Sequence, residues 1–304
     1  MKATAQSHAQ HERLGRGILF MVLAVFCFAI MDVAMKELAS RMSAMQVSFF
    51  RGATSLPFVL LWLIMTNRLP RIKPNKWHLH LVRGVVSIAF LTLTVITLRE
   101  LPLANAYAIF FVAPLLITLL SVPLLKEKVG VHRYSAVAVG FIGVVIMLNP
   151  NAMGFLSYGV ITGLLATLGY ALIMVMVRYM HRSETSESLM FYFVLSLSVG
   201  CGVIALFDWR PVLLTDMPWL FGLGVSGAIA QYLLTEAYRM APPSLLSSFE
   251  YTAMIWALAL GYLLWGDWPG AYVLIGAGVV IASGIYISHR EAIKNSAIRK
   301  TELP

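Results

Sequence analysis

The chain has 304 residues, of which 59% are hydrophobic and only 12% are charged; its mean hydropathy is +0.79 and its formal net charge is +9. Soluble domains use about 45–50% apolar and about 25% charged residues, so this composition excludes an ordinary soluble protein and places most of the chain in lipid. The basic residues lie between apolar runs rather than on one polar face, which is typical of membrane orientation and argues against a nucleic-acid partner.

Ten apolar runs follow one another along the chain. Residues 1–16 are polar and are expected to form a disordered cytoplasmic tail. The first runs lie at about 17–34, 46–66, 78–98, 103–125 and 132–148, and the others at about 157–177, 188–207, 217–238, 244–264 and 270–288. Since a helix of about 20 residues crosses a bilayer, we predict an all-α integral membrane protein with ten transmembrane helices. Residues 289–304 form a basic cytoplasmic tail.

Loop charge predicts the orientation of these helices. If the N-terminus is cytoplasmic, the loops on the opposite side hold only Lys36, Arg41, Arg99 and Arg210, and all other loop and tail cations are inside. The positive-inside rule therefore places both termini in the cytoplasm. The expected location is the inner (plasma) membrane of a bacterium.

An internal repeat divides the chain into two parts, 17–150 and 151–288. Residues 98–130 align without a gap on 238–270 at an offset of 140, which pairs Arg99 with Arg239, Pro102 with Pro242 and Gly130 with Gly270. Each part has five spans, an odd number, so the second must cross the membrane in the opposite sense. Such inverted repeats are the usual construction of secondary transporters, with the binding site between the copies.

Several short motifs carry a family resemblance. They are Arg83-Gly84, Leu101-Pro102 and Pro114 in the first part, and Tyr238 to Pro242, Phe249-Glu250-Tyr251 and Trp265-Gly266-Asp267 in the second. With these motifs the chain resembles the drug/metabolite transporter superfamily, specifically the EamA-type exporters. The resemblance implies a cavity lined by helices from both parts, and it leaves the substrate open among amino acids, vitamins, nucleotides and drugs. It also implies that the last helices of the two parts pack together or form a homodimer interface.

The repeat fails at one position of interest, where Phe110 in the first part corresponds to Glu250 in the second. A carboxylate within a membrane span is costly and is by default a functional candidate. Ser247 and Tyr251 share its helical face. We expect Glu250 to recognise a cationic group or to couple transport to protons; the alternative is a carboxyl that locks helices together.

Two more charged residues lie within spans. Asp32 is a candidate for the cavity or an outer gate, although an i, i+4 pair with Lys36 is the simpler interpretation. Arg51 is a candidate for binding an anionic group, against a pair with Asp32 or a snorkelling position. For Glu236, a local ion pair with Arg239 is favoured.

Aromatic and polar side chains complete the predicted cavity wall. They belong to the fourth, sixth and eighth spans, and they are Tyr107, Phe110, Phe111, Tyr170, Gln231 and Tyr232. An aromatic stripe is more often packing than ligand contact, but related helices of both parts should flank one cavity.

The sequence contains no pattern that indicates an enzyme, a metal site or a cofactor, and no phosphate-binding loop for ATP. We therefore expect a secondary active transporter of a small polar or amphipathic metabolite, working by alternating access with proton or exchange coupling, and we favour export. The alternatives are an importer or exchanger of a cofactor-like or nucleotide-like solute, and a lipid-handling or scaffold protein. The expected partners are a small-molecule substrate and the lipid bilayer.

Overall fold

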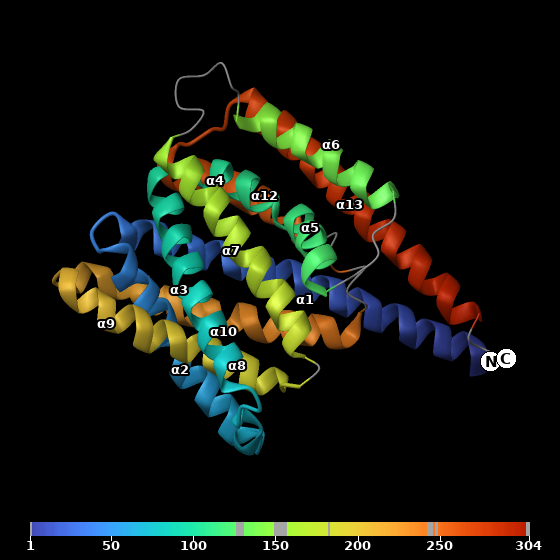
Figure 1. Ribbon diagram of the computed structural model, residues 1–304, viewed down its shortest axis with the longest axis horizontal. Coiled ribbons are helices and arrows are strands. Elements are labelled where there is room, and N and C mark those ends of the chain that lie inside the picture. Colours follow the sequence, from blue (N-terminus) through green and yellow to red (C-terminus); the bar gives the residue numbers. More distant parts are fainter. Residues whose placement is uncertain are drawn as a thin grey trace.

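The computed structural model describes residues 2–125, 131–148, 157–181, 183–241, 246 and 249–301, and every regular element within these ranges is helical (Figure 1). Among them, seven helical segments are long and apolar enough to cross a membrane: Leu14–Ala39, Ala44–Met65, Trp77–Glu100, Leu103–Leu125, Tyr158–Met180, Ser186–Asp208 and Leu214–Met240. Three shorter apolar segments are Ser135–Met147, Ala253–Trp265 and Ala271–Tyr286. The described part of the chain is thus an all-helical membrane protein.

The first part of the chain contains α1 (Lys2–Ala39), α2 (Ala44–Met65), the short 3-10 helix η1 (Leu69–Ile72), α3 (Trp77–Glu100), α4 (Leu103–Phe110), α5 (Ala113–Leu125) and α6 (Val131–Leu148). The start of α2 is set by Ser43, whose hydroxyl accepts a hydrogen bond from the Gln46 amide at 3.3 Å. Such an N-cap satisfies one of the amides that a helix start leaves free.

The second part contains α7 (Tyr158–Met180), α8 (Ser186–Ser196), a π-helical turn η2 (Leu197–Cys201), α9 (Gly202–Ala205), the 3-10 turns η3 (Leu206–Asp208) and η4 (Leu214–Asp216), α10 (Met217–Met240), α12 (Ala253–Trp265) and α13 (Ala271–Thr301). Ser157 and Thr185 cap α7 and α8 in the same way as Ser43 caps α2.

The N-terminal tail differs from expectation, because α1 already begins at Lys2. At the other end, α13 continues through the basic tail to Thr301. Residues 2–16, expected to be disordered, are helical. They contain no proline, and their alanine, glutamine and arginine residues favour helix, so α1 runs through Gly15 and Gly17 at the edge of the apolar run.

The fourth span is broken, where the sequence predicted one continuous helix. α4 ends at Phe110 and α5 begins at Ala113, with a turn at Phe111 and Val112. Pro114, at the start of α5, explains the break because proline cannot donate the hydrogen bond that would continue α4. A second turn, at Tyr251 and Thr252, precedes α12.

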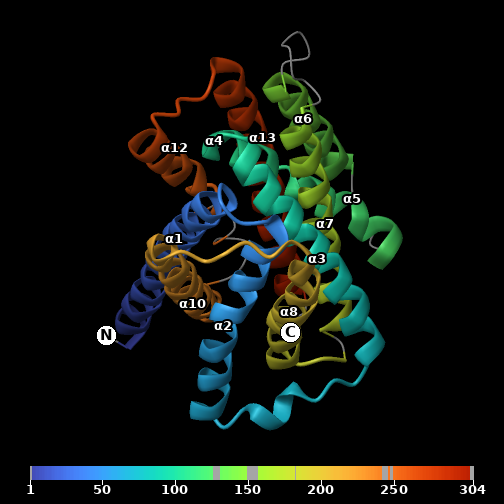
Figure 2. The same ribbon diagram turned by 90° about the vertical axis from the view of Figure 1, so that its left-hand side faces the viewer.

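The helices pack in pairs that bring distant parts of the chain together. α1 packs against α10, α3 against α7, α2 against α8 and η2, and α6 against α13. Figure 1 shows α6 and α13 side by side along one edge of the molecule, and Figure 2 gives the view turned by 90°. Their backbones approach closely because both carry glycine: a Cβ on Gly143 would lie 2.9 Å from the Gly276 carbonyl oxygen.

The outer faces of the helices are apolar. Large side chains such as Leu61, Ile64, Phe221 and Leu263 are more than half exposed in the isolated chain. An apolar exterior around hydrogen-bonded helices is what a bilayer requires, and it places these faces against lipid.

A candidate solute cavity between the two parts of the chain

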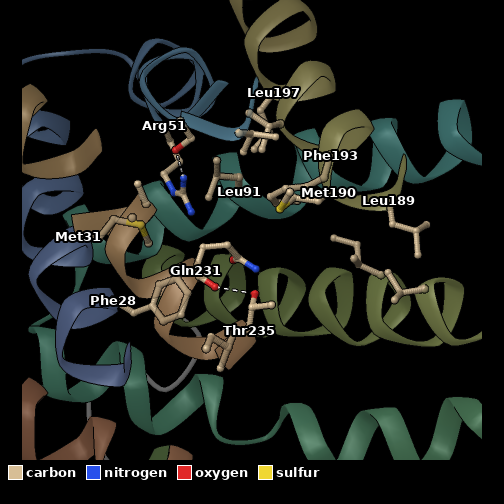
Figure 3. A pocket seen from close by; sticks show the side chains of 18 of the residues that line it. Phe28, Met31, Arg51, Leu91, Leu189, Met190, Phe193, Leu197, Gln231 and Thr235 are labelled. Carbon is tan, nitrogen blue, oxygen red and sulfur yellow. Dashed lines mark hydrogen bonds between the residues drawn. The ribbon is translucent and has the colours of Figure 1, made fainter. Parts of the chain in front are cut away.

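A cavity of about 1160 Å³ lies among α1, α2, α3, α4, α7, α8 and α10 (Figure 3). Its apolar wall includes Phe28, Met31, Phe90, Phe110, Met174 and Phe193. Figure 3 shows Arg51 and Gln231, from α2 and α10, pointing into the same space, with Phe28 and Met31 of α1 beside them. A mostly apolar space with a few converging polar groups is typical of a small-molecule site.

Asp32 of α1 is fixed at the cavity wall by Tyr107 of α4. The Tyr107 hydroxyl donates to Asp32 Oδ2 at 2.6 Å, and the Tyr107 side chain is 7% exposed. Both residues line the cavity. Since the bond uses one oxygen of the carboxylate, the other oxygen is left for a further donor.

Arg51 of α2 is held by small neighbours. Its Nη1 donates to Ser55 Oγ at 2.6 Å, one turn further along the same helix. A Cβ on Gly227 of α10 would lie 3.3 Å from both the Nη1 and the Cζ of Arg51, so the glycine leaves room for the guanidinium. Next to Arg51, Gly52 allows α2 to touch η2, because a Cβ there would lie 2.6 Å from the Ser198 amide nitrogen.

The structure brings most of the predicted wall residues to this cavity. Besides Asp32, Arg51 and Tyr107, the lining includes Phe110, Tyr170, Gln231 and Tyr232. Tyr170 packs against Phe90, with ring centroids 5.6 Å apart. Tyr232 is 57% exposed and therefore contributes only part of its side chain.

The remaining predicted site residues lie apart from the lining. Phe111 and Tyr251 occupy the two helix breaks and touch each other, with ring centroids 5.3 Å apart. Glu250 accepts a hydrogen bond from the Tyr238 hydroxyl at 2.8 Å and interacts electrostatically with Tyr170. Ser247 lies outside the described residues. Glu250 is thus near the cavity wall, but it is not grouped with Asp32 and Arg51.

The simpler pairings considered for these charges have mixed outcomes. The expected pair of Asp32 with Lys36 is wrong, because Tyr107 holds Asp32 and the Lys36 ammonium donates to two backbone carbonyls. Within the described residues, Asp32 and Arg51 form no ion pair with each other. The pair of Glu236 with Arg239 is confirmed, at 2.6 Å.

The cavity reaches the surface at the end where α2 stops. Arg68, Arg71 and Arg239 line it there, and their side chains are 43%, 60% and 69% exposed. Arg68 and Arg71 both contact Glu187 of α8, at 3.0 and 3.3 Å. These residues form the mouth of the cavity.

A network beside the mouth, which we call the first clasp, joins the connection 66–76 to the connection 181–185. Glu184 Oε1 accepts from the amides of Asn75 and Lys76, and its Oε2 lies 3.3 Å from His80 Nε2 and from Ser188 Oγ. Burial raises the pKa of Glu184, but these hydrogen bonds outweigh it and hold the pKa below its usual value. No sequence pattern indicates this network, because its members are far apart in the chain.

A second clasp lies at the opposite end of α2. Arg41 contacts Asp216 at 2.8 Å, and the buried Gln46 side chain exchanges two hydrogen bonds with the backbone of Arg210, at 2.8 and 3.0 Å. Asp216 is 1% exposed. The connection after α1 is thereby bonded to the connection before α10.

Lys36 lies near the same end of α2 as the second clasp, one turn beyond Asp32 on α1. Its ammonium donates to the carbonyl oxygens of Leu98 and Leu101, each at 2.6 Å, and lies 5.4 Å from the centre of the Trp265 ring. Trp265 also donates to Glu37 Oε1 at 2.9 Å. One side chain thus joins α1 to the end of α3 and to α12.

Among the described residues, no group of three or more His, Cys, Asp or Glu side chains is arranged to hold a metal ion. The polar groups of the cavity are suited to binding a solute through charge and hydrogen bonds.

Comparison with known proteins gives consistent matches over nearly the whole chain. A model described as the EamA-like transporter family matches residues 15–149 and again residues 157–289. An uncharacterized transporter of Helicobacter pylori is 27% identical over 281 residues, which cover 90% of this chain and 94% of that protein.

Two relatives with assigned substrates are similar over the same length. An S-adenosylmethionine uptake transporter of Rickettsia bellii is 27% identical over 279 residues, covering 90% of this chain and 94% of that protein. The pseudopaline exporter CntI of Pseudomonas aeruginosa is 25% identical over 279 residues, covering 90% and 96%. A crystal structure superposes with a TM-score of 0.61 at 16% identity, covering 90% of this chain and 98% of that one, which shows the shared fold.

Proposed function

Since the chain belongs to the EamA-like transporter family, we propose that it is a secondary active transporter that carries a small polar or amphipathic metabolite by alternating access. The observation that carries the proposal is the cavity with Asp32 and Arg51 on its walls, enclosed by helices from both parts of the chain. Charges within membrane spans are retained where a function needs them. We place the protein in a bacterial inner membrane with both termini in the cytoplasm.

Two inverted five-helix repeats are part of this proposal, and the packing supports them. If each half has the same order of helices, the contact of α1 with α10 has its counterpart in the contact of α7 with α3, and both occur. The contact of α2 with α8 joins the second helix of each half, and the contact of α6 with α13 joins the fifth helix of each half. Exchanging the two halves leaves each of these contacts unchanged, and both occur. The family model also matches the chain twice.

The two helix breaks support the same arrangement. The turn at Phe111 and Val112 and the turn at Tyr251 and Thr252 are separated by the repeat offset of 140 residues. Discontinuous helices at corresponding positions of two halves are typical of transporters and lie close to their binding sites. The contact between Phe111 and Tyr251 then lies near the axis that relates the halves.

The cavity is open at its arginine-lined mouth and closed at the Lys36 end, so alternating access requires the Lys36 contacts to release. We favour export, which is the activity named for the Pseudomonas relative. Uptake or exchange of a nucleotide-like solute is the second candidate, because the Rickettsia relative is named an S-adenosylmethionine uptake transporter.

Counterflow in proteoliposomes tests the proposal directly. Vesicles loaded with unlabelled S-adenosylmethionine, pseudopaline or L-tryptophan are expected to accumulate the labelled form of at least one of them. Protein-free vesicles are the control. No exchange of any of the three, together with movement of a fluorescent lipid between leaflets, would contradict solute transport and favour a lipid-handling protein.

Replacing Lys36 by methionine should open the closed end of the cavity. The variant loses two charge-assisted hydrogen bonds while it keeps an apolar stem, so the closed population should fall on the order of tenfold or more. Spin labels at Ser40 and Arg99, in a background without Cys27 and Cys201, should report a new population at longer distance. Lys73→Met, in the connection after η1, is the matched control and should leave the distances unchanged. Identical distributions in the wild type and in Lys36→Met would contradict the role of Lys36.

A further inference from the structure

The connection 66–76, between α2 and α3, contains four cations and no acidic residue. The four are Arg68, Arg71, Lys73 and Lys76. Arg68 and Arg71 both pair with the buried Glu187 of α8. The side chains of Lys73 and Lys76 are exposed, and within the described residues neither ammonium group contacts an acidic side chain. These two lysines therefore carry positive charge that the described part of the protein does not neutralise.

The cations at the opposite end of α2 and α3 differ, because each of them has a partner. The ion pairs are Arg41 with Asp216, Arg99 with Glu100, and Arg210 with Asp208, while Lys36 donates to two carbonyl oxygens. An exposed loop cation without a partner is thus not the general case in this protein. The charge of Lys73 and Lys76 is available for a ligand from outside the chain.

The backbone of the connection is fixed, although its surface is exposed. Glu184 accepts hydrogen bonds from two of its amides, at 2.9 and 2.7 Å, and the Thr185 hydroxyl donates to the Arg71 carbonyl oxygen at 2.6 Å. Pro70 and Pro74 restrict the backbone further, because the proline ring fixes φ. A fixed backbone presents its cations with less loss of conformational entropy when a ligand binds.

Exposed apolar side chains adjoin these cations on both sides. Met65 ends α2 and Trp77 begins α3, and both are more than half exposed. Leu81, one turn further along α3, is also more than half exposed. Tryptophan at the end of a membrane span is typical of the level of the lipid headgroups. The order apolar, basic, apolar is therefore what the boundary between lipid tails and headgroups favours.

These neighbours restrict the chemistry of the ligand. A phosphate group accepts hydrogen bonds from lysine ammonium groups, and a phospholipid adds acyl chains for the exposed apolar side chains beside them. A zwitterionic headgroup would bring its own cation close to the lysines, and like charges repel each other. An anionic headgroup has no such cation. The surface is therefore complementary to an anionic phospholipid.

We propose that the connection 66–76 binds the headgroup of an anionic phospholipid. Lys73 and Lys76 donate to its phosphate, and its acyl chains lie along the exposed side chains of Trp77 and Leu81. In the orientation proposed above, this lipid belongs to the cytoplasmic leaflet, where anionic lipids attract basic segments next to a membrane span. The site is on the outer surface of the protein and does not depend on which solute the cavity binds.

Lipid retention by the purified full-length protein tests the proposal. The protein in an uncharged detergent is titrated with dioleoylphosphatidylglycerol and, separately, with dioleoylphosphatidylcholine, and bound lipid is counted by native mass spectrometry. The acyl chains are the same, so the comparison isolates the headgroup. Phosphatidylglycerol should bind about tenfold or more tightly, since each cation near an anionic membrane surface strengthens binding about fivefold. Equal retention of the two lipids would overturn the proposal.

Two double variants then locate the site. Lys73→Gln with Lys76→Gln should lose most of the preference for phosphatidylglycerol. This variant should fold, because both side chains are exposed and residue 76 bonds Glu184 through its backbone amide, which glutamine keeps. Arg99→Gln with Arg210→Gln removes the same charge at the opposite end and should keep the preference. A preference that survives in the lysine variant, or that falls equally in both variants, would overturn the site.

Inorganic phosphate separates the lipid from a soluble anion. Added at the same concentration as the lipid, it should leave the bound phosphatidylglycerol in place, because it makes no contact with the apolar side chains. Displacement of the lipid would overturn the proposal and assign the lysines to a soluble phosphate. All these measurements are made without a transported solute, so their outcome is separate from that of the transport experiments.

Discussion

Gly227→Leu is expected to abolish solute exchange in proteoliposomes while the protein still folds. A Cβ at this position would already lie 3.3 Å from the Arg51 guanidinium and from Met31 Sδ, so a leucine side chain must push Arg51 away from the cavity. Loss of a hydrogen bond to a charged group is enough to lower affinity by about tenfold or more. The leucine also fills part of the space between α1, α2 and α10. Exchange of the transported solute is measured by counterflow.

Gly222→Leu provides a matched control on the same helix. A Cβ at Gly222 has nothing within 4 Å, so leucine fits there without displacing a neighbour. Gly222→Leu should therefore exchange solute at the wild-type rate. Loss of exchange in both variants, or in neither of them, would contradict the prediction that the space at Gly227 positions Arg51.

Gly276→Val should destabilise the protein more than any surface substitution. A Cβ at Gly276 of α13 would lie 2.5 Å from the Gly143 carbonyl oxygen and 2.6 Å from the Met147 backbone nitrogen of α6. Backbone atoms cannot rotate away, so α6 and α13 must separate. The expected loss in free energy of unfolding is about 1–3 kcal/mol or more. It is measured by denaturation in detergent.

Gly278→Val separates this contact from the general effect of valine in a helix. Gly278 lies two residues further along α13, and its Cβ would meet nothing within 4 Å. The free energy of unfolding of the Gly278→Val variant should therefore stay close to that of the wild type. Equal destabilisation of the two variants would contradict the close contact of α6 with α13.

Much of the fold could be predicted from the sequence, because lipid leaves few solutions for a chain of apolar runs. The starts of α2, α7 and α8 follow serine or threonine, and the bounds of α2, α3, α6, α7 and α10 agree with the predicted runs to within three residues. The break after Phe110 was missed. Its cause, Pro114, is visible in the sequence, but an apolar run without polar interruption favours a continuous helix. Its counterpart at Tyr251 has no proline to reveal it.

The candidate site was predicted in part. Residue type alone marks a charge within a span, so Asp32 and Arg51 could be identified as candidates. The Tyr107 hydroxyl that bonds Asp32, and the Gly227 that leaves room for Arg51, could not be identified, because both residues lie on other helices and the sequence contains no distances. The near neighbour Lys36 therefore looked like the partner of Asp32. Glu250 was the most unusual residue of the repeat and could be identified as a candidate. Its hydrogen bond to Tyr238 and its place outside the cavity lining could not be predicted, because they depend on three-dimensional packing.

The two clasps bear on which parts of the molecule can move. Each bonds the first part of the chain to the second, one at each end of α2, and both are formed in the same conformation. Opening either clasp breaks the contacts of a buried carboxylate, Glu184 or Asp216, which is unfavourable. We therefore expect the clasped helices to stay together as a fixed frame. If the protein moves, we expect the movement in the segments outside this frame, α4 and α12, and in the contacts that Lys36 of α1 makes with the end of α3 and with Trp265.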